Sequence, residues 1–385
     1  MKKQIIKIRI IYFLKFFADA LFSGYLSMYF LTFFDLYSLE YGILLGAIPF
    51  CSLVGNFLWG LLSKDLRKNL LLIKIILITE IVSLLLFVFV GKDFITLLIF
   101  TVFVSLCNSP YFSFQDGIGS AYAQKDKVSY TSIRIMGSCG YLLALALGAG
   151  AIYIFKENYQ IIFFIAGIIY LICLAIWFFV EPFDNLTIEE KDKIKFREVL
   201  KNKYFLLYFL AYIFIIGSNN VADSYLFARM SIVNVNSSIY SLVFASEVLF
   251  EIIISLLIIK FVKEKDYFKF LKISVLFIFL RAFLFGFNLP LPALIIFAPL
   301  RGIGWGGFIS LHLMVIKKIV SKKLVTKTIS LLAIALSLVN GIFTLCGTSI
   351  YSQITLPGFY FLLSGVIFIG IIILYSIKNE ALKQE

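Results

Sequence analysis

The chain has 385 residues, of which 61% are hydrophobic and 17% aromatic, and its mean hydropathy is +0.99. These values exceed what the core of a water-soluble protein needs, so the composition indicates an integral membrane protein. The net charge of +13 could suggest a nucleic-acid partner, but most of the 35 lysines and arginines fall at the expected cytoplasmic ends of the apolar segments. The basic charge is therefore attributed to membrane topology, and no nucleic-acid partner is expected.

A helix that crosses a bilayer needs about 20 mostly apolar residues, and the sequence contains about twelve such segments. We therefore predict an all-α integral membrane fold. In chain order, the expected spans are residues 9–33, 41–62, 70–91, 95–123, 133–155, 160–181, 204–230, 238–262, 268–288, 290–319, 326–350 and 356–377. The first apolar run is too long for a signal peptide and is expected to remain as a span.

One long polar connection, residues 182–203, divides the predicted spans into two sets of six. Its sequence is charged and carries Pro182. We predict an N-terminal six-helix half (1–181), a linker (182–203) and a C-terminal six-helix half (204–385). Two six-helix halves around a central site are typical of the largest class of secondary transporters.

The distribution of lysine and arginine predicts the orientation in the membrane. With the N-terminus in the cytoplasm, the basic connections KDLRKN and KKIVSKKLVTK are cytoplasmic, while Lys92, Lys156 and Arg229 lie outside. This pattern satisfies the positive-inside rule. We expect a multi-pass protein of the cell membrane with both termini and the linker cytoplasmic.

Several functional classes lack support in the sequence. The five cysteines lie in apolar segments without metal-ligand or disulfide spacing, so no metal or cofactor is expected. The G-x-G-x-x-G pattern of Gly302, Gly304 and Gly307 follows no soluble strand, and close helix packing is the better interpretation. No nucleophile has a base at useful spacing, which disfavours an enzyme.

Charged residues inside predicted spans are the strongest functional signal, because each costs about 2.5 to 3.5 kcal/mol at the centre of a membrane helix. Such residues must be paired or hydrated. Six stand out: Asp116, Arg134, Asp223, Glu247, Arg281 and Arg301.

Sequence distance predicts two ion pairs. Asp116 and Arg134 lie nine residues before and after Lys125, at the expected tip of a helical hairpin, so their depths match. Glu247 and Arg281 are likewise each seventeen residues from Glu264. Buried ion pairs can serve only to fix helix register, and this structural role remains an alternative to a functional one.

Tyr141 lies nearly two helical turns after Arg134, on about the same helix face. An arginine, a carboxylate and an aromatic ring that face one cavity suit a polyhydroxylated ligand. Core packing is the competing interpretation of Tyr141.

The chain resembles the oligosaccharide:proton symporter branch of the major facilitator superfamily, to which the lactose permease belongs. The resemblance is strongest in GILLGAIPFCSLVGNFLWGLLSKDLRK (Gly42 to Lys68), SPYFSFQDGIGSAYAQKDKVSYTSIRIMGSCGY (Ser109 to Tyr141) and LRGIGWGGF (Leu300 to Phe308). It implies the major facilitator fold, with twelve transmembrane helices in two six-helix halves.

The resemblance also implies roles for individual residues. Asp116 and Arg134 match a sugar-binding carboxylate and arginine, and Tyr141 matches a sugar-stacking tryptophan. For coupling, Glu247 matches a glutamate that links sugar to proton, Arg281 matches an arginine of the ninth helix, and Asp223 matches an acidic position on the seventh.

Some positions depart from the family pattern. Arg301 stands where the family has a histidine that contacts sugar, Gly304 replaces the glutamate that carries the proton, and Phe250 replaces an asparagine that contacts sugar. These changes argue against lactose as the substrate and leave the proton mechanism open. In GLLSKDLRKN, which resembles the gating motif of the superfamily, Asp65 and Arg67 are the expected gating residues.

Five other charged or titratable residues lie in the predicted spans. Lys15 and Asp19, one helical turn apart, are expected to form an intrahelical pair, and Asp19 could line the cavity. The sequence does not decide the roles of Glu80 and Glu251. His312 is interpreted as a satisfied helix residue rather than a proton relay.

From the residues and the resemblance together, we expect a monomeric secondary active transporter that imports a small polyhydroxylated solute, such as a sugar, glycoside or nucleoside. Protons are the expected coupling ion, and the expected substrate-binding set is Asp116, Arg134, Tyr141 and Arg301. An exporter of amphipathic or lipid-linked compounds is the first alternative. A membrane sensor that binds solute without moving it is the second.

Overall fold

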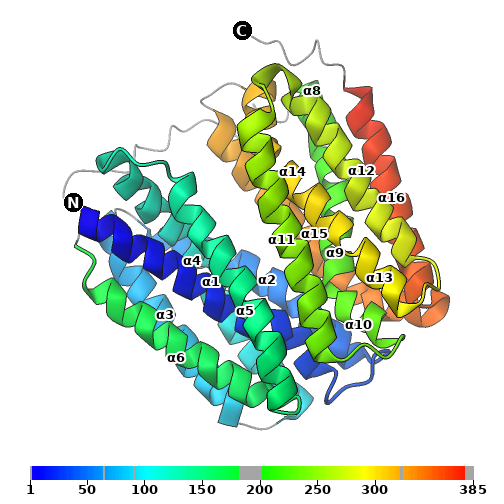
Figure 1. Cartoon of the computed structure of the whole chain (residues 1–385), viewed down its shortest axis with the longest axis horizontal. Coiled ribbons are helices and arrows are strands. Elements are labelled where there is room, and N and C mark those ends of the chain that lie inside the picture. The colour runs from blue at the N-terminus through cyan, green and yellow to red at the C-terminus, as the bar shows by residue number, and fades with distance from the viewer. Residues whose placement is uncertain (1, 64–65, 90–91, 182–201, 321–323, 378–385) are drawn as a thin grey trace. The chain divides into compact units, whose positions relative to one another are not determined.

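A computed structural model of the protein describes residues 2–63, 66–89, 92–181, 202–320 and 324–377, where all regular secondary structure is helical. The first part of the chain forms six long helices (Figure 1). They are α1 (Lys2–Phe30), α2 (Leu39–Leu62), α3 (Leu66–Phe89), α4 (Phe94–Lys125), α5 (Thr131–Ile154) and α6 (Tyr159–Phe178). Apart from the earlier start of α1, these bounds agree with the predicted spans to within a few residues.

The second part of the chain also follows the predicted spans. Its elements are α8 (Lys203–Tyr212), η1 (Ile213–Gly217), α9 (Ser218–Ser224), α10 (Leu226–Ser231), α11 (Ser237–Phe261), η2 (Glu264–Asp266), α12 (Tyr267–Phe285), α13 (Leu291–Phe297), α14 (Pro299–Ile319), α15 (Val325–Ile354) and α16 (Leu356–Ser376).

Two of the predicted spans are interrupted rather than continuous. The span at 204–230 contains the π-helical turn η1 and ends as α9 and α10, which meet at Tyr225. The span at 290–319 is divided into α13 and α14 at Pro299, which has no N–H to continue the helical hydrogen bonds. Both interruptions lie close in sequence to charged residues of the predicted site, Asp223 and Arg301.

Short polar side chains set where several helices begin. The Ser38 hydroxyl accepts a hydrogen bond from Tyr41 N at the start of α2, and Asp93 accepts one from Thr96 N at the start of α4. Asn202 accepts from Tyr204 N and Phe205 N at the start of α8. These caps satisfy N–H groups that have no partner in the first turn of a helix.

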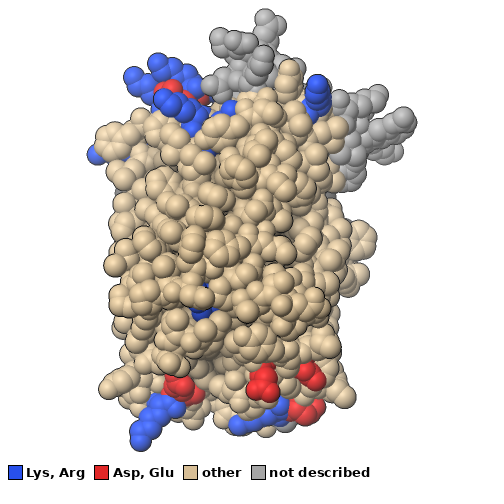
Figure 2. Space-filling model, turned by 90° about the vertical axis from the view of Figure 1, so that its right-hand side faces the viewer, with Lys and Arg blue, Asp and Glu red and all other residues tan. Residues whose placement is uncertain are grey.

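Ten helical segments of the described residues are long and apolar enough to cross a membrane. The helices α1 and α12 are not among them. Lys15 and Asp19 make α1 less apolar, and Lys269, Lys272 and Arg281 do the same for α12. The face in Figure 2 has a broad, almost uncharged band, and acidic and basic side chains gather at its two ends. The protein is therefore an all-α, multi-pass membrane protein, as predicted.

The chain divides into two compact units, each of which has its own helix packing. Unit 1 contains Met1–Lys191 and Ser237–Ala245, and unit 2 contains Asp192–Asn236 and Ser246–Glu385. In unit 1, α1 packs against α5 and α6, α4 packs against α2 and α3, and α3 packs against α6 (Figure 1). In unit 2, α12 packs against α14 and α16.

Candidate functional site

In unit 1, the structure brings Asp116 of α4 and Arg134 of α5 together. The Arg134 Nη1 to Asp116 Oδ2 distance is 3.7 Å, and the two side chains are 53% and 36% exposed. The hydroxyl of Tyr12 donates to Asp116 Oδ1 at 2.8 Å and lies 3.4 Å from the Tyr130 hydroxyl. The pair is therefore held on one side by α1, and its guanidinium remains accessible to a ligand.

A cavity of about 340 Å³ lies within unit 1. Its wall combines aromatic rings with neutral polar groups and a single charged side chain, Asp19. The lining residues are Phe16, Asp19, Phe22, Ser23, Leu26, Ile48, Ser52, Val104, Ser105, Asn108, Ser109, Phe112 and Tyr141. Tyr141 lines this cavity, whereas Asp116 and Arg134, which were expected to face the same cavity, are not part of its lining.

Unit 2 contains a cluster of five charged side chains, one of which is Arg281. This residue is 1% exposed, and its Nη2 lies 3.2 Å from Asp223 Oδ1 and 3.7 Å from Glu247 Oε1. The predicted depth match between Glu247 and Arg281 corresponds to a contact in the structure. Arg281 also stacks its guanidinium over the ring of Phe285, at 4.8 Å from the ring centroid.

Arg301 completes the cluster in unit 2. Its Nε lies 3.0 Å from Asp223 Oδ2 and 3.9 Å from Glu247 Oε2, and its Nη1 lies 3.3 Å from Glu251 Oε2. The sequence grouped Arg301 with the substrate-binding residues, but its observed partners are the carboxylates assigned to coupling and Glu251. Two guanidinium groups face three carboxylates in this cluster, so one carboxylate is in excess.

Glycines of α14 explain how Arg301 reaches the carboxylates of α11. A Cβ at Gly302 would overlap the backbone oxygen of Glu247, and one at Gly306 would overlap that of Glu251. A side chain at Gly304 would collide with the backbone of α12 at Ser274 and Ile278. The glycine-rich segment is thus a close-packing surface, which agrees with its interpretation from sequence.

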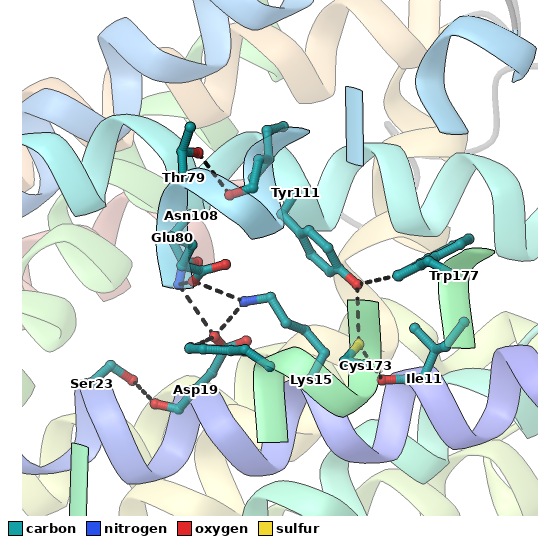
Figure 3. Close-up of polar contacts among 12 residues, drawn as sticks. Ile11, Lys15, Asp19, Ser23, Thr79, Glu80, Asn108, Tyr111, Cys173 and Trp177 are labelled. Atoms are coloured by element: carbon teal, nitrogen blue, oxygen red, sulfur yellow. Dashed lines mark hydrogen bonds and ion pairs between the residues drawn. The ribbon is translucent and has the colours of Figure 1, made fainter. Parts of the chain in front are cut away.

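A third charged group, in unit 1, was not recognised from the sequence as a site. Lys15 of α1 is fully buried, and it forms ion pairs with Asp19 of the same helix and, at 3.2 Å, with Glu80 of α3. Asn108 of α4 donates to both carboxylates, at 3.2 Å to Asp19 and 2.6 Å to Glu80 (Figure 3). The Tyr170 hydroxyl of α6 donates to Asp19 Oδ1 at 2.6 Å.

Only one contact of this group can be predicted from the sequence. The spacing of Lys15 and Asp19 predicted their intrahelical pair. Glu80 stood alone on its span, and its nearest ion-pair partner is 65 residues away in the chain. Nothing in the local sequence could have connected Glu80 to Lys15.

The remaining predicted residues lie apart from these groups. Asp65 falls outside the described residues, and Arg67, in the first turn of α3, has an exposed side chain. His312 hydrogen-bonds with the Tyr208 hydroxyl at 2.6 Å and stacks on Tyr208, Tyr212 and Phe308. This environment agrees with the interpretation of His312 as a satisfied helix residue.

A sequence model of the "MFS_1 like family" matches residues 5–363, which is nearly the whole chain. No curated sequence matches significantly. Among solved structures, that of a point mutant of the nucleoside transporter NupG matches with a TM-score of 0.78 and 14% identity, and the match covers 99% of this chain and 100% of that one.

Two further transporters have a similar fold. A bacterial homologue of the human lysosomal transporter Spinster, in an inward-facing and occupied conformation, matches with a TM-score of 0.67 and 14% identity, covering 97% of this chain and 95% of the other. The human organic anion transporter MFSD10 matches with a TM-score of 0.66 and 14% identity, and the match covers 97% of this chain and 99% of the other. At these identities, the likeness concerns the fold.

Proposed function

Because the chain belongs to the MFS_1 like family of the major facilitator superfamily, we propose that it imports a small polyhydroxylated solute together with protons. Membership makes it a membrane-embedded secondary transporter of small solutes rather than an enzyme. We propose, beyond this class, that the solute is polyhydroxylated, that transport is inward and that protons are the coupling ion. Its assignment to the oligosaccharide:proton symporter branch likewise stays a prediction.

The observation that carries the proposal is the composition of the cavity wall in unit 1. The rings of Phe16, Phe22, Phe112 and Tyr141 offer apolar faces, while Asn108 and several serines offer hydrogen bonds. Its volume of about 340 Å³ lies within the usual range for small-molecule sites. Sugars, glycosides and nucleosides combine an apolar ring face with hydroxyl groups, and the neighbour NupG is itself a nucleoside transporter.

The exposed pair of Asp116 and Arg134 supplies a second set of polar groups. Arg134 can donate to the hydroxyl oxygens of a solute, and Asp116 can accept from the hydroxyl hydrogens. In the proposed mechanism these two residues and Tyr141 bind the solute. Arg301 was expected among the binding residues, but its contacts with three carboxylates favour a role in coupling.

Glu247 is the proposed proton carrier. It is fully buried, and both of its carboxylate oxygens lie within 4 Å of a guanidinium without a hydrogen bond among the described residues. Because three carboxylates share two arginines, protonation of one carboxylate would leave the cluster neutral, which lowers the cost of burial in the membrane. Asp223 and Arg281 would adjust the field at Glu247 as the transporter alternates between its two faces.

Uptake of radiolabelled sugars, glycosides and nucleosides into proteoliposomes, under an imposed proton gradient, tests the proposal. We expect inward accumulation of at least one solute, accompanied by proton entry. Glu247→Gln should lose gradient-driven accumulation but keep counterflow, because exchange of bound solute need not move a proton.

Other outcomes of this experiment would replace the proposal. Outward transport would indicate an exporter of amphipathic or lipid-linked compounds, and binding without flux would indicate a sensor. Flux without a pH change would remove proton coupling, and accumulation that survives Glu247→Gln would exclude Glu247 as the carrier.

A further inference from the structure

The buried group formed by Lys15, Asp19, Glu80 and Asn108 has an unbalanced charge. One ammonium faces two carboxylates, and the three charged side chains are at most 6% exposed. If both carboxylates were ionised, the group would carry one uncompensated negative charge inside the membrane-embedded unit. An uncompensated buried charge is costly, so the group is stabilised by one additional positive charge.

The geometry shows where that charge can be accommodated. Asp19 Oδ2 and Glu80 Oε2 are buried and have no hydrogen-bond partner among the described residues. By contrast, the inner oxygens Oδ1 and Oε1 both accept from Lys15 and from Asn108. The space between the two carboxylates is therefore filled by N–H donors (Figure 3).

This arrangement favours a proton over a metal ion. A bound cation such as Na⁺ needs several oxygen ligands that point at one position, but here the amide of Asn108 presents its NH₂ group to both carboxylates. The described residues contain no group of three or more His, Cys, Asp or Glu that could hold a metal ion. A proton needs only one lone pair, and the unpartnered outer oxygens supply it.

The other titratable groups that surround the carboxylates are neutral at physiological pH. They are the phenols of Tyr111 and Tyr170 and the thiols of Cys107 and Cys173, contributed by α4 and α6. Lys15 also lies over the rings of Tyr111, Phe112 and Tyr170, at 4.6 to 5.1 Å from their centroids. These contacts stabilise the ammonium, so Lys15 remains charged and the adjustable proton belongs to the carboxylates.

We infer that Asp19 and Glu80 form a second proton-binding site, in unit 1, which holds one proton per chain. Glu80 carries this proton at Oε2. Asp19 is the better-stabilised anion because its Oδ1 accepts from Lys15, Asn108 and Tyr170 and because its side chain borders the cavity, whereas Glu80 is enclosed. Tyr170 also interacts with the Glu80 carboxylate, so burial rather than this phenol separates the two groups. The reaction is simple protonation, in which Glu80 carboxylate and H⁺ give the carboxylic acid and the group becomes neutral.

The site has a direct route to the solute. Asp19 and Asn108 line the cavity, whereas Glu80 does not. Asp19 Oδ2 is itself enclosed, so a solute in the cavity would lie next to the buried pair without touching this oxygen. The polar groups of the solute would change the electric field at the two carboxylates, so solute binding and proton binding would influence each other. Proton binding itself does not depend on which solute is carried.

Infrared spectroscopy of the full chain in lipid nanodiscs over a range of pH tests this site without any solute. The variant Glu247→Gln serves as the parent protein. Its cluster in unit 2 has two arginines and two carboxylates, so the charges balance and this cluster should contribute no protonated carboxyl group. The parent should show the C=O stretch of one protonated, buried carboxylic acid per chain at neutral pH. Added to the parent, Glu80→Gln should abolish this band.

Asp19→Asn gives a second, independent result. It leaves Glu80 as the sole carboxylate beside Lys15, so the charges balance without a proton and the band should also disappear at neutral pH. Glu264→Gln, at a side chain that is 79% exposed, is the matched control and should keep the band. Gel filtration checks that each variant is folded.

Two results would overturn the inference. The first is the absence of a band from a protonated carboxyl group in the parent protein between neutral and mildly acidic pH. This result can be obtained with the parent protein alone. The second is a band that persists in both folded variants, Glu80→Gln and Asp19→Asn. Neither result bears on whether the protein transports a polyhydroxylated solute, so failure here is separate from failure of the uptake experiment.

Discussion

The charged residues of the candidate sites differ in how deeply their side chains are buried. Arg134 is half exposed, and its ion pair with Asp116 is long at 3.7 Å, whereas Arg281 and Lys15 are almost completely enclosed. Exposed ion pairs contribute about 0 to 1 kcal/mol to stability, while an enclosed charge that loses its partner costs several. Substitution of Arg134 therefore separates binding from folding more cleanly than substitution of Arg281 or Lys15.

Arg134→Ala should abolish or strongly weaken solute binding in a protein that still folds. Hydrogen bonds from a charged group contribute about 1.5 to 3 kcal/mol, so we expect affinity to fall by roughly 10- to 100-fold. Isothermal titration with a solute identified by uptake measures the loss, and the melting temperature should change little. Lys156→Ala, at an exposed position in the same unit, is the control. Normal binding by Arg134→Ala would make the pair structural.

At the scale of helices, small residues decide which charged side chains can meet. On α14, Gly302 and Gly306 let the helix approach the backbone of α11, so that Arg301 reaches Glu247 and Glu251. Without a hydrophobic driving force between helices in lipid, close backbone contact is a principal source of their association. The same segment therefore supports both helix packing and the charged cluster.

Gly302→Ala should destabilise the protein, because the added methyl group collides with the backbone oxygen of Glu247. Over-packing of this kind costs about 1 to 3 kcal/mol, and we expect a lower melting temperature in detergent. Gly365→Ala on α16 is the matched control, because nothing lies within 4 Å of the added Cβ, and its melting temperature should not fall. Equal melting temperatures for Gly302→Ala and the wild type would show that α14 and α11 pack less closely.

At the scale of the whole molecule, each compact unit contains a buried charged group with one more carboxylate than cations. In unit 2 the group is built around Arg281 and Arg301, and in unit 1 around Lys15. The orientation of the chain in the membrane is a separate property. It follows from the basic connections, and it remains a prediction together with the location in the cell membrane.

Labelling with a membrane-impermeant thiol reagent tests the orientation. In a parent without the five native cysteines, Asn236→Cys should react from outside intact cells and Lys193→Cys should not, because the positive-inside rule places residues 182–203 in the cytoplasm. Opening the cells should make Lys193→Cys reactive, which is the control for that position. The reverse pattern would overturn the predicted topology.

The sequence by itself determined the membrane class, the helical fold and most of the helix bounds. Apolar length and capping residues act within one segment, so these features can be read without a partner. The sequence also predicted the contacts between Asp116 and Arg134 and between Glu247 and Arg281, because equal distances from a hairpin turn place two residues at equal depth. Membership of the major facilitator superfamily was likewise evident from motifs such as LRGIGWGGF.

Only the tertiary structure decided which side chains share a site. Glu80 meets Lys15 across 65 residues, Arg301 meets three carboxylates from two other segments, and Tyr141 lines a cavity with Asp19 and Asn108. Depth along a helix follows from residue number, but the face that one helix turns towards another depends on the packing of the whole unit. That packing depends on close contacts of glycines such as Gly302, whose partner helix a single sequence does not identify.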